Sequence, residues 1–123
     1  MKILVATEKA FAPVAIKLIR EVTDAAGHQL ALLENYKMKE ELLDAVSDAD
    51  GLIVRSDLVT EEVLAAAKKL KIVVRAGAGY DNLDLPACTA HNVVAMNTPG
   101  QNSNAVAELA FEMMLYMARS GFS

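Results

Sequence analysis

The sequence has few of the residues that mark several classes of protein. It contains one cysteine, Cys88, so no intramolecular disulfide can form, and a reducing compartment such as the cytoplasm is expected. Acidic residues outnumber basic ones, which gives a net charge of −4, and the Lys and Arg residues form no cluster. This balance argues against partners such as nucleic acids or anionic membranes.

Long apolar runs and metal-ligand patterns are missing as well. No run approaches the roughly 20 residues of a membrane-spanning helix. Residues 3–6 are too short for the core of a signal peptide, and Glu8 follows them closely. No His/Cys cluster has the spacing of metal ligands. Neither His28 nor His91 has a partner placed for a catalytic triad. A soluble protein without a metal site is therefore expected.

The composition is that of a globular chain. Its 123 residues are 54% apolar and 23% charged, which matches one folded domain and not a disordered segment. A domain of this length buries roughly two thirds of the surface of its unfolded chain. It can therefore form a core without disulfides.

Five short apolar runs alternate with segments of helical periodicity. The predicted strands cover residues 2–6, 29–34, 51–55, 71–76 and 93–96. A first helix is predicted to begin at Pro13 and to end before Gly27. The other predicted helices cover residues 39–47, 61–70, 85–90 and 105–118. Strands that alternate with helices form parallel sheets with both faces covered. With right-handed crossovers, this pattern predicts an α/β, flavodoxin-like fold with five strands ordered 2-1-3-4-5.

The last predicted helix is apolar around most of its circumference. Between residues 105 and 118 only Glu108 and Glu112 are charged. Together with Asn104 and Arg119 they occupy a stripe about 80° wide. A terminal helix of a small domain normally shows one apolar face. We therefore expect a second contact surface, such as another domain or a partner subunit. The alternative is a deeply buried core helix.

Polar residues follow three of the predicted strands, at residues 55–57, 75–82 and 97–104. Ligands of open α/β sheets bind beyond the carboxyl ends of the strands. Arg55 and Arg75 follow neighbouring strands, and two guanidinium groups suit a ligand with carboxylate or phosphate groups. The alternative is that these arginines pair with Asp57 or Asp81.

A glycine pair, Gly77 and Gly79, follows the fourth strand and imitates a dinucleotide-binding loop. The fingerprint G-x-G-x-x-G fails, because Asn82 holds the third position and Pro86 prevents a long helix from starting at the loop. Glycines also let backbone amides approach a small anion. The amides of Ala78 and Gly79 are therefore candidates for a carboxylate site, and a tight turn without a ligand is the alternative.

Two other flavodoxin-like families fit less well. A phospho-acceptor receiver domain, the main alternative, would use Asp57, but it also needs an acid pair after the first strand and a Lys after the fifth. Those positions hold Thr7 and Glu8, and Asn97 and Thr98. A flavin-binding flavodoxin needs a Ser/Thr-rich phosphate loop after the first strand, and residues 7–13 contain no glycine and one Thr.

Three motifs together resemble the D-2-hydroxyacid dehydrogenases. They are "VRS" at 54–56, "RAGAGYDNLDL" at 75–85 and "MNTPGQNSNAVAELA" at 96–110. The resemblance extends along the whole chain. It implies a substrate-binding domain at 1–100, and a linker and interdomain helix at 101–123 that would lead into a Rossmann domain. In this family that second domain binds NAD and mediates dimerisation.

The resemblance also assigns roles to single residues. The residues implied to bind a small anionic 2-hydroxy acid are Arg55, Ser56, Arg75, Ala78 and Gly79. Those implied to line the cleft near the nicotinamide are Asn102, Ser103 and Val106. The family's nucleotide loop and its catalytic Arg, Glu and His have no counterpart in these 123 residues. We therefore expect a substrate-binding fragment with no catalytic residue or cofactor of its own. Its helix at 104–120 would fold back onto the sheet or exchange with a second copy, with residues 98–100 as the hinge.

Overall fold

The computed structural model describes residues 1–98, 100 and 102–120. Its centre is a sheet of five parallel strands in the order β2-β1-β3-β4-β5. The strands are β1 (Lys2–Thr7), β2 (Gln29–Glu34), β3 (Gly51–Val54), β4 (Ile72–Arg75) and β5 (Val94–Asn97). The predicted strand order is confirmed, and the predicted strand ends differ from the observed ones by a single residue at most.

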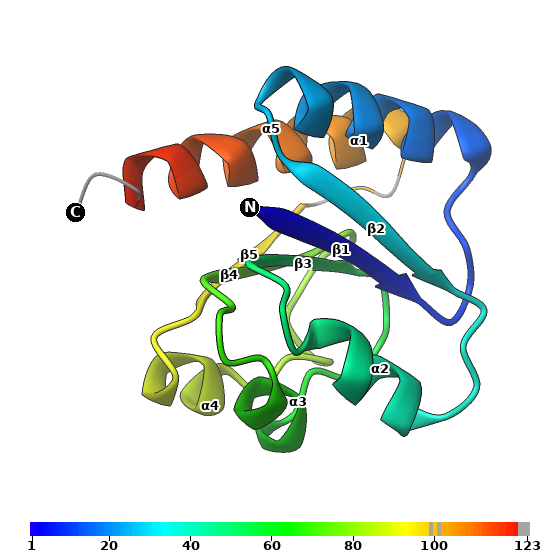
Figure 1. Ribbon diagram of the computed structural model, residues 1–123. Coiled ribbons are helices and arrows are strands. Elements are labelled where there is room, and N and C mark those ends of the chain that lie inside the picture. Colours follow the sequence, from blue (N-terminus) through cyan, green and yellow to red (C-terminus); the bar gives the residue numbers. More distant parts are fainter. Residues whose placement is uncertain (99, 101, 121–123) are drawn as a thin grey trace.

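Helices cover both faces of the sheet, as the sequence predicted (Figure 1). On one face lie α1 (Pro13–Ala25) and α5 (Ser103–Ser120), and on the other lie α2 (Lys39–Val46), α3 (Glu61–Ala66) and α4 (Leu85–Ala90). Successive residues of a strand point to opposite faces. Ile3 and Val5 of β1 therefore pack under α1 and α5, whereas Leu4 and Ala6 pack against the other layer.

Local sequence signals set most of the helix ends. Pro13 lies in the first turn of α1, and Gly27 follows that helix with φ +77°, a conformation that glycine adopts readily. Thr60 caps α3 by accepting a hydrogen bond from the amide of Val63. The prediction for α3 was too long, because the helix ends at Ala66. After it the chain turns so that Ala67 and Leu70 enter the core, at 5% and 6% exposure.

Helix α5 folds back along α1 and over the sheet of its own chain. Its buried side chains are those of Val106, Leu109, Ala110, Met113, Met114 and Met117. Phe111 and Leu115, in contrast, are 54% and 49% exposed. The helix is therefore a core element that also presents apolar surface. The predicted boundary between residues 100 and 101 stays a prediction, and Pro99, Gln101 and residues 121–123 lie outside the described residues.

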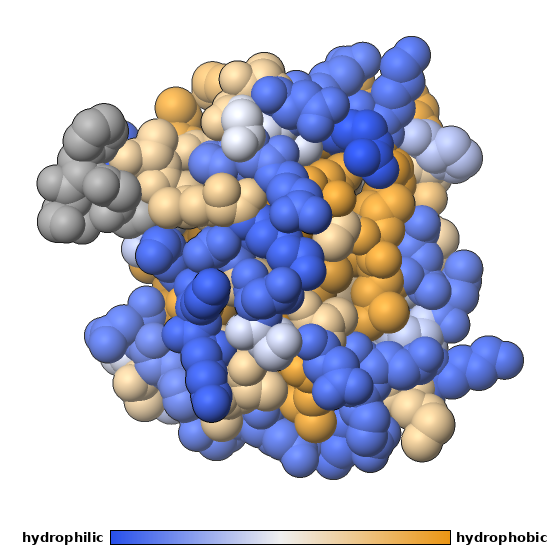
Figure 2. All heavy atoms as spheres, in the orientation of Figure 1, coloured by the Kyte–Doolittle hydropathy of each residue, from blue (hydrophilic) through white to orange (hydrophobic). Residues whose placement is uncertain are grey.

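The visible surface differs between one helical layer and the edge of the sheet (Figure 2). In Figure 2 hydrophilic side chains dominate over α2, α3 and α4, whereas hydrophobic ones show over the edge strand β2. Leu32 of that strand is 37% exposed. Within residues 1–98, 100 and 102–120, no helix is long and apolar enough to cross a membrane.

Gly51 allows α5 to approach the sheet. A Cβ atom at this position would lie 3.0 Å from Cδ1 of Ile3, 3.1 Å from the sulfur of Met113 and 3.3 Å from the sulfur of Met117. Close-packed interiors do not accommodate added atoms at such distances without moving their neighbours. The missing side chain therefore provides the space in which the two methionines of α5 rest on β3.

We predict that Gly51→Val lowers the free energy of unfolding by about 1–3 kcal/mol, because the added side chain displaces Met113 and Met117. Gly51→Ala costs less, since the flexible ends of these methionines can shift. Urea denaturation measures both values. Gln29→Val, on an exposed position of β2, is the control and changes stability by less than about 0.5 kcal/mol. A wild-type midpoint for Gly51→Val would contradict this packing.

Candidate functional site

The carboxyl ends of the three strands β3, β4 and β5 meet at one edge of the sheet. Val54 pairs with Arg75, and Arg75 pairs with Asn97. The segments that continue from these residues, 55–57, 76–82 and 98, therefore lie side by side. We call the region formed by residues 55–57, 75–82 and 97–98 the carboxyl edge. It contains all five residues predicted to bind substrate.

Arg75 is the most distinctive residue of the carboxyl edge. It is the last residue of β4 and is half-buried. Its Nε and Nη1 atoms are buried and have no hydrogen-bond partner among the described residues. The predicted alternative, an ion pair with Asp81, is not among the salt bridges of this part of the chain. Because buried polar groups are rarely left unpaired, these two nitrogen atoms indicate a place for an acceptor.

The glycine loop lies close to this guanidinium group at Gly79. Gly79 has φ +85°, and a Cβ atom there would lie 3.8 Å from Nη1 of Arg75. Ala78 and Gly79 are exposed, and neither amide donates a hydrogen bond to another described residue. The carbonyl of Gly79 accepts a hydrogen bond from Nδ2 of Asn97 (3.3 Å), which ties the loop to β5. Free amides beside a cationic group are typical of an anion site.

Arg55 leaves the end of β3 and turns toward the loop between β1 and α1. Its Nη1 atom donates to the carbonyls of Lys9 and Ala10, both at 3.3 Å, and its guanidinium lies 5.4 Å from the ring centroid of Phe11. The guanidinium and the aromatic face attract each other. The sequence had not indicated that residues 8–11 contact the carboxyl edge. Ser56, the next residue, is exposed.

Asp57 is a buried carboxylate that accepts hydrogen bonds from three donors. Its exposed fraction is 5%. Oδ2 accepts from the hydroxyl of Tyr36 (2.7 Å) and the amide of Glu8 (2.8 Å), and Oδ1 accepts from the amide of Arg55 (3.2 Å). Burial and the neighbouring Asp57 raise the pKa of Tyr36 well above its usual range, so the hydroxyl remains a donor. Asp57 therefore lacks the accessible oxygens of a phospho-acceptor.

Asn82 joins two loops of the carboxyl edge. Its Nδ2 atom donates to the carbonyls of Arg55 (3.1 Å) and Asp57 (2.7 Å). The backbone strengthens the same connection, because the amide of Val59 donates to the carbonyl of Asn82 and the amide of Asp84 donates to the carbonyl of Val59. In the sequence, Asn82 stands out only because it occupies the third glycine position of the dinucleotide fingerprint. The one sequence feature that could have pointed to this connecting role is a side-chain amide shortly after a glycine pair.

The residues predicted to lie near a nicotinamide are at the start of α5. Asn102 is exposed and caps the helix, because its Oδ1 atom accepts from the amide of Ala105 (2.9 Å). Ser103 is half-buried, and Val106 of α5 is 1% exposed in the core between this helix and the sheet. No cofactor contact of these three residues is tested by the structure, and their roles stay predictions.

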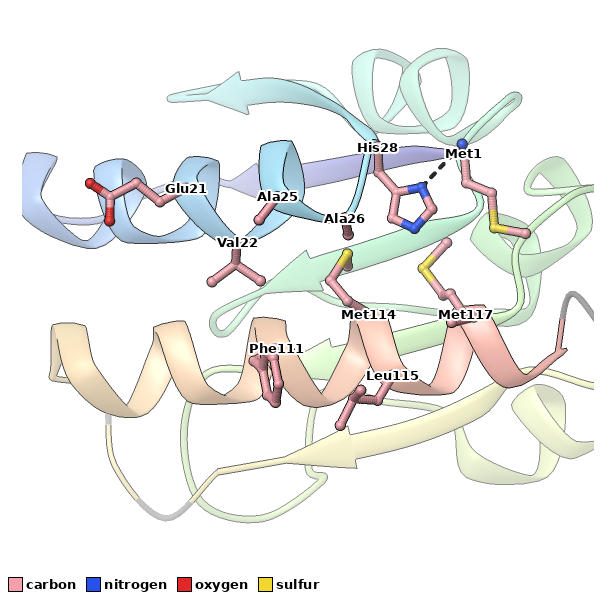
Figure 3. Close-up of a pocket in the computed structure, with 11 residues that line it drawn as sticks. Met1, Glu21, Val22, Ala25, Ala26, His28, Phe111, Met114, Leu115 and Met117 are labelled. Atoms are coloured by element: carbon pink, nitrogen blue, oxygen red, sulfur yellow. Dashed lines mark hydrogen bonds between the residues drawn. The ribbon is translucent and has the colours of Figure 1, made fainter.

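A hollow opens at the opposite end of the sheet from the carboxyl edge. It has a volume of about 670 Å³ and lies between the ends of α1 and α5, near the N-terminus. Figure 3 shows Met114 and Met117 of α5 directed toward α1 and Met1, where the terminal amine contacts Nδ1 of His28 at 3.3 Å. Its lining is mainly apolar, and its two basic groups, the terminal amine and His28, contact each other. Size alone does not identify the functional site here.

The remaining candidates are structural. Nε2 of His91 pairs with Oε1 of Glu61 at 2.8 Å on the surface. Cys88 is buried, and desolvation raises the pKa of its thiol, which makes it unreactive. In the part of the chain that the structure describes, no three His, Cys, Asp or Glu residues are grouped for a metal ion.

Comparison with known families identifies this architecture. The model of the D-isomer specific 2-hydroxyacid dehydrogenase catalytic domain matches residues 3–120. The chain belongs to this family. The resemblance carried by the three sequence motifs is therefore confirmed, and the receiver-domain alternative is not supported.

The family members most relevant here share one name. D-3-phosphoglycerate dehydrogenase of Sus scrofa is 48% identical over 101 residues, which cover 81% of this chain and 19% of that protein. The enzyme of Methanocaldococcus jannaschii is 41% identical over 107 residues, with 86% and 19% covered. The chain thus spans about a fifth of the length of the curated relatives it matches.

Solved structures agree with the fold. The NAD+-bound 3-phosphoglycerate dehydrogenase of Entamoeba histolytica is 54% identical and superimposes with a TM-score of 0.80. The match covers 100% of this chain and 41% of that one. The D-lactate dehydrogenase of Escherichia coli, at 22% identity and a TM-score of 0.66, shares the fold. The structural neighbours are thus dehydrogenases of the same fold as this 2-hydroxyacid dehydrogenase domain.

Proposed function

We propose that this chain is the substrate-binding part of an NAD-dependent D-3-phosphoglycerate dehydrogenase-like enzyme. The parent enzyme would oxidise a phosphorylated 2-hydroxy acid in serine biosynthesis. The names of relatives at 41–48% identity support this choice of substrate. The observation that carries the proposal is Arg75, whose buried Nε and Nη1 atoms have no hydrogen-bond partner among the described residues and lie close to the exposed residue Gly79.

The carboxyl edge offers complementary groups for the two ends of such a ligand. The amides of Ala78 and Gly79 suit a carboxylate, because two N–H groups can approach its oxygen atoms without a side chain in the way. Arg55, Ser56 and Arg75 suit the phosphate, since a guanidinium fork binds two oxygen atoms at once. In this assignment the chain binds and orients the acid, and it contributes no general acid or base.

NAD enters the proposal only as the cofactor of the parent enzyme, where it accepts a hydride. The described residues do not fit a dinucleotide on their own. Gly77 and Gly79 do not open a long helix, because α4 has six residues and carries Pro86 in its first turn. No long helix presents its amides to a pyrophosphate there. We propose residues 1–100 as the substrate-binding domain and 101–123 as the linker and interdomain helix.

We also propose that the protein is located in the cytoplasm. The buried, reduced Cys88 fits the cytoplasm that the sequence suggested.

Binding of D-3-phosphoglycerate should shift the amide resonances of residues 77–79 in an NMR titration of the 123-residue chain. Arg75→Lys keeps the positive charge but loses the planar fork, so we expect its affinity to fall by about tenfold or more. Arg119→Lys, on the exposed end of α5, is the matched control and should bind like the wild type. Absence of any shift at residues 77–79 of the wild-type chain would sink the proposal.

The isolated chain should be catalytically inert. Its sequence contains neither a dinucleotide loop to bind NAD nor an acid/base pair to accept the proton of the substrate hydroxyl. We expect no NADH absorbance when the purified chain is mixed with NAD and D-3-phosphoglycerate, and negligible NAD binding by calorimetry. A complete dehydrogenase of the family serves as the positive control. Measurable NADH formation would show that this expectation is wrong.

We also propose that the helix at 104–120 gives the chain a route to a homodimer, by exchange or by pairing of its exposed apolar residues. Phe111 and Leu115 support this, because both are large and about half exposed. Light scattering of the purified chain measures its mass. A dimer that Phe111→Ser converts to a monomer would agree with pairing through this surface, whereas a strictly monomeric mass at high concentration excludes it.

A further inference from the structure

A buried carboxylate connects the strand ends around the proposed anion site. Asp57 accepts hydrogen bonds from Tyr36 after β2, from Glu8 after β1 and from Arg55 after β3. Asn82, in the loop after β4, donates to the carbonyls of Arg55 and Asp57. Residues after β1, β2, β3 and β4 thus meet in one hydrogen-bonded network, which we call the Asp57 network.

A left-handed backbone conformation at Asn35 brings Tyr36 into this network. Asn35, directly after the edge strand β2, has φ +59°, and its amide donates to the carbonyl of Thr7 (2.9 Å). Asparagine is one of the few residues other than glycine that tolerates this left-handed conformation. The resulting turn directs the Tyr36 side chain inward, where it is 8% exposed and its hydroxyl reaches Asp57.

The network holds the peptide groups of Arg55 from both sides. Oδ1 of Asp57 accepts from the amide of Arg55 at 3.2 Å, and Nδ2 of Asn82 donates to the carbonyl of Arg55 at 3.1 Å. These two bonds set the direction in which the Arg55 side chain leaves β3. Because Asn82 lies in the same loop as Gly79, the bonds also set the position of the glycine loop relative to Arg55.

A carboxylate in this position is costly unless its acceptors are filled. Burying an unpaired charge is strongly unfavourable, whereas charge-assisted hydrogen bonds to fixed donors compensate for the lost water. Asp57 therefore makes the geometry of three neighbouring segments interdependent: loss of any one donor leaves a buried carboxylate oxygen short of a partner. An apolar residue would fill the same space without specifying where the Arg55 amide points.

We propose that Asp57, supported by Tyr36 and Asn82, is a positioning residue that holds Arg55 and the glycine loop at the separation a phosphorylated hydroxy acid requires. Asp57 has no contact with the ligand in this assignment and acts through Arg55. The inference rests on the proposed function of the carboxyl edge, and it adds residues to which neither the sequence motifs nor the comparisons assign a role.

The test compares variants that alter the network but not the groups facing the ligand. Tyr36→Phe removes one hydroxyl on the side of Asp57 away from the glycine loop, and Asp57→Asn retains the shape of the side chain. Tyr116→Phe is the matched control, because Tyr116 belongs to α5 and packs against the core on the other face of the sheet. Affinities for D-3-phosphoglycerate and for inorganic phosphate are measured by NMR on the 123-residue chain, together with the stability of each variant to urea.

We expect Tyr36→Phe to weaken D-3-phosphoglycerate binding by about three- to tenfold and Asp57→Asn by about tenfold or more, since hydrogen bonds to a charged group are involved. Inorganic phosphate, which needs one of the two subsites, should lose less affinity. In the Asp57→Asn background Tyr36→Phe should have no further effect on affinity, because Tyr36 acts through Asp57. Tyr116→Phe should bind both ligands like the wild type.

The alternative outcomes separate this inference from the proposed function. Folded Tyr36→Phe and Asp57→Asn chains that are less stable but bind D-3-phosphoglycerate with wild-type affinity would show a purely structural role and overturn the inference alone. An equal loss for both ligands would also overturn it, since the spacing of two subsites would then not matter. A wild-type chain that binds neither ligand overturns the proposed function, and the positioning role with it.

Discussion

Burial of both sheet faces is the constraint on which the rest of this molecule depends. Each strand packs under α1 and α5 on one side and against α2, α3 and α4 on the other, so side chains on the faces must be apolar. Polar chemistry is then confined to the ends of the strands, where the helices no longer cover the chain. The parallel direction of all five strands brings their carboxyl ends to one edge, and the arginines and glycines follow those ends.

The two ends of the sheet differ in chemistry. The carboxyl edge combines Arg75, with two buried nitrogen atoms that have no partner among the described residues, and a loop in which Ala78 and Gly79 are exposed. The amino-terminal end carries the apolar hollow between α1 and α5. Arg55 and Arg75 also differ from each other, since Arg55 contacts the carbonyls of Lys9 and Ala10 and the ring of Phe11. A ligand at the carboxyl edge would therefore meet Arg75, two of whose nitrogen atoms lack a partner among the described residues, and Arg55, which backbone carbonyls already hold.

Most of the fold was predictable because local patterns and global packing agree. The apolar runs, Pro13, Gly27 and Thr60 all act where the sequence indicated. The misjudged end of α3 has a tertiary cause: helical periodicity continued to Leu70, but the core took up Ala67 and Leu70 in a turn. The apolar circumference of α5 was also visible in advance. The sequence did not indicate how much of this apolar surface the sheet and α1 would bury.

For the site, the sequence by itself determined which residue types stand at the strand ends, because strand order and side-chain alternation follow from the pattern of apolar residues. It therefore placed Arg55, Arg75 and the glycine loop together at the carboxyl edge. Only the tertiary structure decided what these residues contact. Tyr36, Asp57 and Asn82 lie in separate loops, and their hydrogen bonds span 21 to 27 residues of sequence. No local pattern encodes such pairings, since each depends on where the crossovers place the next strand.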